Sequence, residues 1–412
     1  MHLVWLMAAT FPVAIVSAVS WFGVFTFVNG YLIGCLGWSN ADWTVATLWL
    51  AGGMLFWYPV FTEVSSRIGR RATVKAGLAA VTLAYLGIAF FRSPTLIRLC
   101  LAGMGSGVCA YLAAWSPLAA DIGRDRPRQA LALTMFVLNL VGAATLIGGG
   151  YFAGSAHYRA MFLVFSALCG GCVIAFHILS VRVEAFIDSN RRAGDGAGRH
   201  PPVGVLSLSR QEVAGLVTGP FLVVILFGIC AAPVAFHTAN QLFPNLSRDA
   251  HALSETHIAT LVGVGRIPSL ITLFAISRVV DRLDVMRWYG VGLICDGLMI
   301  VGIGWAPVAT LAAVAFLLFN LLHGVVWGAA LPAIDACVPA RLRDAAFALA
   351  GMAEVTAIFL TGVLHNRLIV SGRSLQFVFF FCGIVAALAG LILFLYSRSH
   401  HSKRVPRGLG GR

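Results

Sequence analysis

Apolar stretches of roughly 20 residues recur from one end of this 412-residue sequence to the other, and that is the length at which an α-helix crosses the hydrocarbon core of a bilayer. Hydrophobic residues make up 59% of the chain and charged residues 11%, whereas roughly a quarter of an ordinary globular domain is charged. Because so little of the chain can face water, the sequence predicts an all-α polytopic membrane protein.

Apolar runs bounded by charged or turn-forming residues predict twelve transmembrane helices in two halves. In the first half the runs are 5–33, 43–64, 73–91, 95–120, 129–151 and 159–181, and in the second half they are 213–240, 256–278, 288–306, 308–334, 344–366 and 374–397. Residues 182–212 are polar, and their composition cannot bury a core. We therefore predict two six-helix halves, 1–181 and 213–397, joined by a linker at 182–212 and followed by a basic tail at 398–412.

The basic residues are unevenly distributed between the loops that twelve helices would create. Of the 29 Lys and Arg residues, 22 fall in the linker, the tail and every second loop. The alternate loops hold Arg92, Arg159, Arg248, Arg367 and Arg373. Since Lys and Arg accumulate on the cytoplasmic side of membrane proteins, we predict a multi-pass protein of the plasma (inner) membrane with both termini in the cytoplasm. This distribution accounts for the net charge of +13, so we expect no nucleic-acid partner.

The two halves share sequence features at a nearly constant spacing. A shift of about 214 residues aligns Asp121 with Asp335 and Asn139 with Glu354, as a duplicated six-helix unit would. The sequence therefore predicts two pseudo-symmetric halves. Asn139, in the run 129–151, would then lie on the opposite wall from Glu354, in the run 344–366.

The loop between the runs 43–64 and 73–91 carries the most specific motif. It reads Thr62-Glu63-Val64-Ser65-Ser66-Arg67-Ile68-Gly69-Arg70-Arg71, and the equivalent loop of the second half reads Ser277-Arg278-Val279-Val280-Asp281-Arg282-Leu283-Asp284. On these residues the chain resembles the major facilitator superfamily of secondary transporters, whose loop follows a GxxxDRxGRR-like pattern. The first loop keeps the RxGRR core, and the second keeps the DR pair.

The resemblance covers nearly all of the chain and implies a central cavity near the bilayer midplane that works by alternating access. It makes loop residues candidates for conformational gating, because charged groups at neighbouring helix ends can pair and bias an inward/outward equilibrium. These residues are Arg67, Gly69, Arg70, Arg71, Asp281 and Arg282, together with Asp121 and Asp335 as latches at helix ends. The alternative is that these charges have no gating role and only reflect the enrichment of Lys and Arg on the cytoplasmic side.

Two further family features are partial. The family usually has an arginine in its fourth helix before a glycine-rich stretch, and here Arg98 precedes Gly103, Gly105 and Gly107. Family antiporters often carry a GPxxGG element in the fifth helix, where this chain has Ala144-Thr145-Leu146-Ile147-Gly148-Gly149. The glycines also suit plain close packing of membrane helices.

Ionisable and amide side chains inside the predicted helices are the other candidate site residues, because such groups are costly in hydrocarbon and usually face a cavity or one another. They are Glu354, Arg266, His323, Asn320, Asn139, His237 and Arg98. Glu354 is the leading candidate for proton coupling, since a carboxyl can load and release a proton as the cavity changes its exposure. Asp296 ranks lower, with an interhelical hydrogen bond as its alternative role.

Arg266 and His323 each leave two interpretations open. Arg266 would favour an anionic solute if it faces the cavity, since guanidinium binds carboxylates at two points, but it could equally be the counter-ion of Glu354. His323 could relay protons or form a hydrogen bond across helices. Asn320 lies three residues before it and therefore on the same helix face.

The sequence thus predicts a secondary active transporter, proton-coupled, that moves a small organic solute, anionic if Arg266 faces the cavity. The alternative is an efflux antiporter for drugs or toxic metabolites. An enzyme is disfavoured, because the chain has no HExxH, no DDxxD and no phosphate-binding Gly-rich loop with its Lys. Its one C-x-x-C, at Cys169 and Cys172, has no second pair, so we expect no metal and no cofactor. The expected partners are the solute, protons and the lipid bilayer, with no obligate protein partner.

Overall fold

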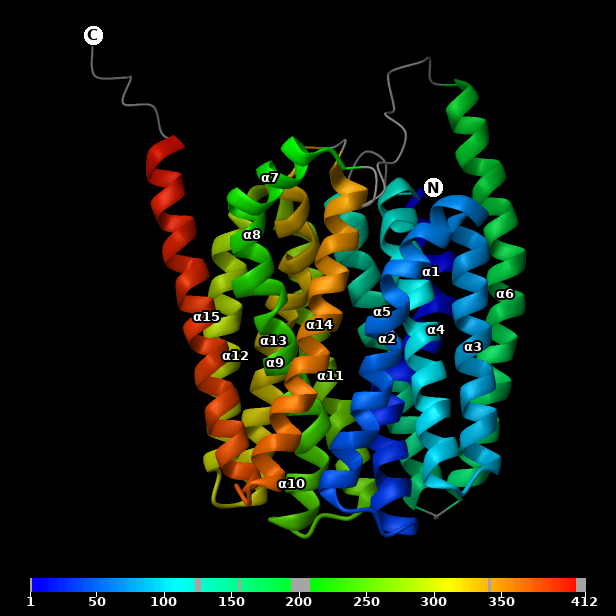
Figure 1. The fold of residues 1–412 in the computed structure, drawn as a ribbon, viewed down its shortest axis with the longest axis vertical. Coiled ribbons are helices and arrows are strands. Elements are labelled where there is room, and N and C mark those ends of the chain that lie inside the picture. The colour runs from blue at the N-terminus through cyan, green and yellow to red at the C-terminus, as the bar shows by residue number, and fades with distance from the viewer. Residues whose placement is uncertain (1, 123–126, 155–156, 194–207, 340–341, 405–412) are drawn as a thin grey trace.

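A computed structural model describes residues 2–122, 127–154, 157–193, 208–339 and 342–404, and every regular element in this part of the chain is a helix. Figure 1 shows a bundle whose long helices run along one common direction. Twelve of them are long and apolar enough to cross a membrane. They span Met7–Cys35, Asn40–Ser65, Arg70–Phe90, Pro94–Ser116, Gln129–Phe152, Tyr158–Arg182, Pro220–Asp249, Glu255–Val279, Val285–Trp305, Ala309–Cys337, Ala345–Val370 and Leu375–Ser399.

The first half of the bundle contains six of these spans. The first span consists of α1 (His2–Ala18) and the π-helical segments η1 (Val19–Val28) and η2 (Tyr31–Cys35). It is followed by α2 (Asn40–Ile68), α3 (Arg70–Phe90), α4 (Pro94–Ile122), α5 (Pro127–Gly154) and α6 (Tyr158–Ala193).

The second half repeats this arrangement. After a short helix, α7 (Arg210–Thr218), the seventh span consists of α8 (Pro220–Val224), η4 (Ile225–Ile229), α9 (Ala231–His237), η5 (Thr238–Leu242) and α10 (Phe243–Asp249). The remaining spans are α11 (Glu255–Val279), which continues into η6 (Val280–Arg282), then α12 (Val285–Trp305), α13 (Ala309–Cys337), α14 (Arg343–Val370) and α15 (Leu375–Arg404).

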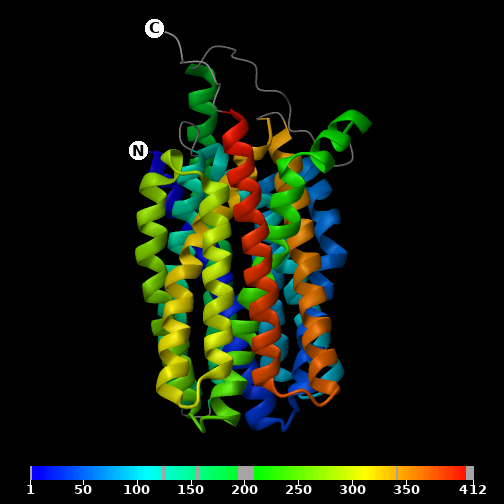
Figure 2. The ribbon, with the colours of Figure 1, turned by 90° about the vertical axis from the view of Figure 1, so that its left-hand side faces the viewer.

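The start of α1 and the end of α15 lie at the same end of the bundle as the end of α6 and the start of α7 (Figure 1). We call this the linker end and the opposite one the far end. Figure 2 shows α15 on the outside of the second half. It packs against α12 so closely that a Cβ on Gly390 would lie 2.7 Å from the carbonyl oxygen of Gly290. Small residues allow such approaches between membrane helices.

The predicted helix 213–240 was wrong at both ends, because the seventh span covers residues 220–249. Gly219 is extended, and Pro220 follows it as the first residue of α8. Proline lacks the backbone N–H that a helix interior needs and disfavours a helical conformation in the residue before it. The chain therefore breaks there, and the preceding helix α7 starts on its own capping box between Ser209 and Glu212.

The two helices that flank the RxGRR loop meet at a single residue. Gly69 ends α2 and precedes α3, and its φ of 89° lies in the region that residues with a Cβ rarely adopt. The glycine of the motif is thus required by the sharp turn itself, whatever the arginines beside it do.

The pseudo-symmetry predicted from the sequence has a counterpart where the first and seventh spans meet. Asn29 donates a hydrogen bond from Nδ2 to Oδ1 of Asn245 at 2.9 Å, across a separation of 216 residues that is close to the repeat spacing. Both spans contain π-helical turns, which often occur at functional sites. The halves also contact through α5 with α11 and through α2 with α14.

Candidate functional site

Arg266 lies near the middle of α11 and its side chain is 0% exposed. One N–H of Nη2 donates a hydrogen bond to Oδ1 of Asn240, in the seventh span. Among the residues that the structure describes, the Nε and Nη1 atoms have no hydrogen-bond partner. A buried cation usually has a carboxylate or several acceptors around it, so this guanidinium is under-satisfied.

Aromatic rings surround the guanidinium. Its central carbon lies 4.1 Å from the ring centroid of Phe22, 5.4 Å from that of Phe236 and 5.6 Å from that of Trp327. Ring faces attract cations at these distances, by about 0.5–2 kcal/mol each. We call Arg266 and these three aromatic residues the Arg266 cage. Because Phe22 belongs to η1 and the others to the second half, the cage spans both halves.

His323, on α13, lies beside the cage. Its Nδ1 is 2.5 Å from Oδ2 of Asp296 on α12, and both side chains are buried. The imidazole stacks on Phe236 with a centroid distance of 5.3 Å and meets Trp327 edge-on at 4.7 Å. The interhelical hydrogen bond proposed as the alternative role of Asp296 is therefore present, and His323 shares two aromatic neighbours with Arg266. Its Nε2 has no partner.

Two asparagines predicted for the site lie in the same region and are fully buried. Asn320 donates to the carbonyl oxygen of Phe316 in its own helix, and Asn139, on α5, donates to that of Met135. In both residues the side-chain oxygen lacks a partner. Asn139 is one turn from Gly142, where an added Cβ would lie 2.5 Å from the Phe22 ring.

Glu354, on α14, is exposed although the rest of its helix face is buried. Ile358, Thr361 and His365, at one, two and three turns farther along the same face, are 7%, 2% and 0% exposed. The carboxyl lies within electrostatic range of Tyr58 on α2 and Cys230 in the seventh span. The Glu354 side chain therefore points between the halves, into accessible space, and not toward lipid.

The structure does not pair Glu354 with Arg266. Among the described residues no ion pair involves either side chain, and the contacts of Arg266 are Asn240 and the aromatic cage. The counter-ion interpretation of Arg266 is therefore not realised in this conformation. The two residues lie on different helices, each near the middle of its span.

Two histidines of the second half lie closer to the far end. His237 is buried in edge contact with Phe25 at 5.2 Å and near Trp21 at 5.6 Å, so it touches the first span. His365, which the sequence did not single out, is buried and shares a 3.0 Å hydrogen bond with the hydroxyl of Thr238. Its spacing of 11 residues from Glu354 places it on the same face and could have drawn attention to it.

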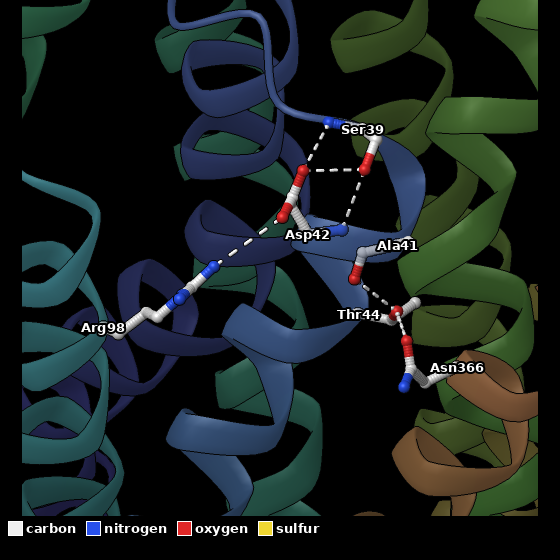
Figure 3. Close-up of polar contacts among 6 residues, drawn as sticks. All are labelled: Ser39, Ala41, Asp42, Thr44, Arg98 and Asn366. Atoms are coloured by element: carbon white, nitrogen blue, oxygen red, sulfur yellow. Dashed lines mark hydrogen bonds and ion pairs between the residues drawn. The ribbon is translucent and has the colours of Figure 1, made fainter. Parts of the chain in front are cut away.

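In the described part of the chain, four hydrogen bonds join the two halves at the far end. They are Asn29 to Asn245 at 2.9 Å, Gln241 to Thr47 at 2.6 Å, Thr44 to Asn366 at 2.8 Å and Asn40 to Asp249 at 3.0 Å. We call these eight residues the far-end seam; Figure 3 shows its Thr44–Asn366 contact. Because the seam connects the first, second, seventh and eleventh spans, it holds the halves together at that end.

Arg98 also lies at the far end, in the first turns of α4. Its Nη2 is 3.7 Å from Oδ1 of Asp42, which belongs to the capping box at the start of α2 (Figure 3), and its guanidinium lies 5.2 Å from the ring of Trp38. Its contacts therefore join elements of the first half, and they do not include the Arg266 cage.

The predicted gating residues lie at the linker end. Arg67 is exposed and pairs with Glu63 of its own helix at 2.8 Å, Arg70 and Arg71 are partly buried, and Arg282 is exposed. Asp335 forms a 2.5 Å ion pair with Arg343, which ties the end of α13 to the start of α14 within the second half. The side chains of Asp121 and Asp281 lie outside the described part of the structure.

The comparison with protein families agrees with the architecture of the chain. The family model of the Major Facilitator Superfamily matches residues 10–362, which is most of the chain. The protein belongs to the major facilitator superfamily. No curated protein sequence matches it significantly. Membership in this superfamily, with twelve apolar helices, makes the chain an integral multi-pass membrane protein and a transporter.

Proposed function

We propose that this superfamily member is a proton-coupled secondary transporter that moves a small organic solute by alternating access. The observation that carries the proposal is Glu354, a carboxyl near the middle of its span that is accessible while its helix face is otherwise buried. A carboxyl in the membrane interior is a functional candidate by default, because its charge is costly there.

Glu354 is placed to couple proton binding to movement of the halves. It belongs to the second half, and its neighbour Tyr58 belongs to the first. A Cβ on Gly351, one turn before Glu354, would collide with the Tyr58 hydroxyl, so α2 and α14 are in close contact beside the carboxyl. When the halves rock, the space that Glu354 faces changes its opening, and its proton can be exchanged with one compartment and then the other.

The far-end seam supports alternating access. Its hydrogen bonds close one end of the interface between the halves in this conformation. The distribution of Lys and Arg places the linker end in the cytoplasm, so the far end would face the outside of an inner membrane. In this assignment the seam breaks when the transporter opens outward.

The test is solute-dependent proton movement in proteoliposomes that contain a pH-sensitive dye. Wild type and Glu354→Gln are compared across a panel of organic acids, sugars and amphiphilic drugs. We expect a proton flux for one solute class in wild type and its loss in Glu354→Gln. The matched control is Glu212→Gln, since glutamine also serves in a capping box, and it should transport as wild type does.

Two outcomes would change the proposal. If Glu354→Gln moved solute with an unchanged pH dependence, Glu354 would not be the coupling residue. If only amphiphilic drugs drove proton movement, and in the opposite direction to the solute, the efflux antiporter would replace the present proposal.

A further inference from the structure

We infer that the Arg266 cage binds the carboxylate of an aromatic or cyclic apolar monocarboxylate, which names the substrate class of the proposed transporter and rests on that proposal. The inference starts from a charged side chain that is 0% exposed and has two nitrogen atoms without partners. An unsatisfied buried polar group costs free energy, and more when it is charged. A buried guanidinium with two unpartnered nitrogen atoms is suited to binding an anion reversibly.

The free positions on Arg266 match a carboxylate. Nη2 carries two N–H groups, of which Asn240 takes one, while Nε and Nη1 are free. Whichever of the two Nη2 N–H groups Asn240 takes, the other one, with Nε or with Nη1, leaves one edge of the guanidinium that offers two parallel donors. This fork is the geometry in which arginine binds carboxylates at two points.

The aromatic walls of the cage determine which groups can be attached to the carboxylate of the ligand. Phe22, Phe236 and Trp327 present rings to the guanidinium, and Phe319 continues this surface past His323, with centroids 5.1 Å apart. A carboxylate bound here would have its remaining atoms against aromatic faces. Flat or cyclic apolar groups pack well on such faces, whereas a sugar would leave its hydroxyl groups without partners.

The charges around the cage limit the ligand to one carboxylate. Arg266 is the only Lys or Arg with a contact in the cage among the described residues. A carboxyl on its border is Asp296, held against His323, whose ring contacts Phe236 and Trp327. A second anionic group on the ligand would lack a cation and approach Asp296, which is unfavourable in a low-dielectric interior.

Phe22 connects this site to movement of the halves. It is the cage residue of the first half, and it lies closest to the guanidinium. A carboxylate that reaches Arg266 competes with the Phe22 ring for the same cation, so binding exchanges a contact between halves for a contact with the ligand. Occupancy of the cage can therefore bias the equilibrium between the conformations.

The experiment measures binding to the full-length protein in lipid nanodiscs by titration calorimetry and by the shift in thermal unfolding. The probes are benzoate, cyclohexanecarboxylate and acetate, with benzamide and benzylamine as neutral and cationic counterparts of benzoate. We expect wild type to bind the two cyclic acids, to bind acetate more weakly and to ignore the amide and the amine.

The decisive variant is Arg266→Lys, which keeps the charge and removes the planar fork. It should weaken benzoate binding at least tenfold. The matched control is Arg278→Lys on the same helix, where an exposed guanidinium lies 4.4 Å from the Phe274 ring, and it should bind benzoate as wild type does. If Arg266→Lys does not fold, Phe22→Leu provides the second test, because losing the ring should lower the preference for benzoate over acetate.

Three results would overturn the inference: benzamide binding as well as benzoate, Arg266→Lys keeping wild-type affinity, or no acid in the panel binding to folded wild type. The outcome is separable from that of the proposed function, because binding requires no proton movement. If benzoate binds but drives no proton flux, only the coupling proposal fails. If other solutes drive proton flux and Arg266→Lys transports them normally, only the carboxylate inference fails.

Discussion

The far-end seam and the Arg266 cage are both polar and shared between the two halves, but they differ in how their polar groups are satisfied. In the seam, amides and hydroxyls find partners across the interface at 2.6–3.0 Å, as in Gln241 with Thr47 and Asn40 with Asp249. In the cage, a guanidinium has one hydrogen bond and is otherwise surrounded by rings. Paired polar groups suit a contact that closes, and an under-satisfied charge suits a site that binds.

The largest expected effect comes from removing the charge of the cage. Arg266→Met keeps an unbranched apolar side chain among the aromatic rings. Replacing a buried ion pair by hydrophobic residues is often neutral or stabilising, by about 1–4 kcal/mol, and Arg266 has no ion-pair partner among the described residues that the substitution would leave uncompensated. We therefore expect a variant at least as resistant to thermal unfolding as wild type, with transport reduced by two orders of magnitude or more.

Thermal unfolding and proteoliposome transport, measured on the same preparation, check this prediction. A strongly destabilised Arg266→Met would mean that the guanidinium holds the fold together, and the contrast between cage and seam would then be lost.

An intermediate effect is expected in the seam. Asn29→Ala removes the hydrogen bond that Asn29 donates to Oδ1 of Asn245, which keeps a 3.2 Å hydrogen bond from Nη1 of Arg248, so the expected loss is that of one hydrogen bond, about 0.5–1.5 kcal/mol. Because the bond exists only when the far end is closed, the variant should shift the protein toward the conformation that is open at that end. The measurement is labelling by a water-soluble maleimide of a cysteine introduced at Leu48, which faces Gly362 of α14 beside the seam, in a variant whose nine native cysteines are replaced.

The double variant Asn29→Ala with Asn245→Ala completes the comparison. Its effect on labelling should be smaller than the sum of the two single effects, since both remove the same bond. Additive effects would show that the two asparagines act independently and that the seam is not held by this pair.

The smallest effect is expected at Arg98, which lies at the same end as the seam but pairs within the first half. Its ion pair with Asp42 is 3.7 Å long, and the two side chains are 26% and 50% exposed. Exposed pairs of this kind contribute about 0–1 kcal/mol. Arg98→Gln should therefore change stability by less than that amount and leave labelling at the far end unchanged.

Transport by Arg98→Gln supplies the control for this prediction. A loss of transport with intact folding would assign Arg98 a role in the transport cycle, as the family resemblance suggested, and would extend the functional region to the far end.

The sequence predicted the membrane class, the number of spans and the superfamily. Twelve apolar runs and the alternation of basic loops depend only on local composition. The difference between the hydrocarbon core and water then determines where each run must lie. The boundary of the seventh span was wrong, because the hydrophobic run continues through Gly219 and Pro220 while the backbone does not. The rule that proline ends a helix was available from the sequence but was outweighed by hydrophobicity.

For the candidate site, the sequence likewise predicted some features and not others. Rarity in hydrocarbon was enough to single out Glu354, Arg266 and His323 from the sequence. Their partners were not predictable, because Asp296, Asn240 and Phe22 are 27, 26 and 244 positions away along the chain from the residues they contact. Only the packing of the helices decided that Arg266 faces rings and not Glu354.

By itself, the sequence determined that this chain spans a membrane, in what order its helices cross it and which few side chains are costly there, because each property depends on residues close together in the chain. The tertiary structure decided which of those side chains are satisfied. Hydrogen bonds and cation–π contacts depend on the rotation and depth of every helix. A carboxyl open to the space between the halves, a closed polar seam and a guanidinium caged by rings from both halves emerge only from that packing.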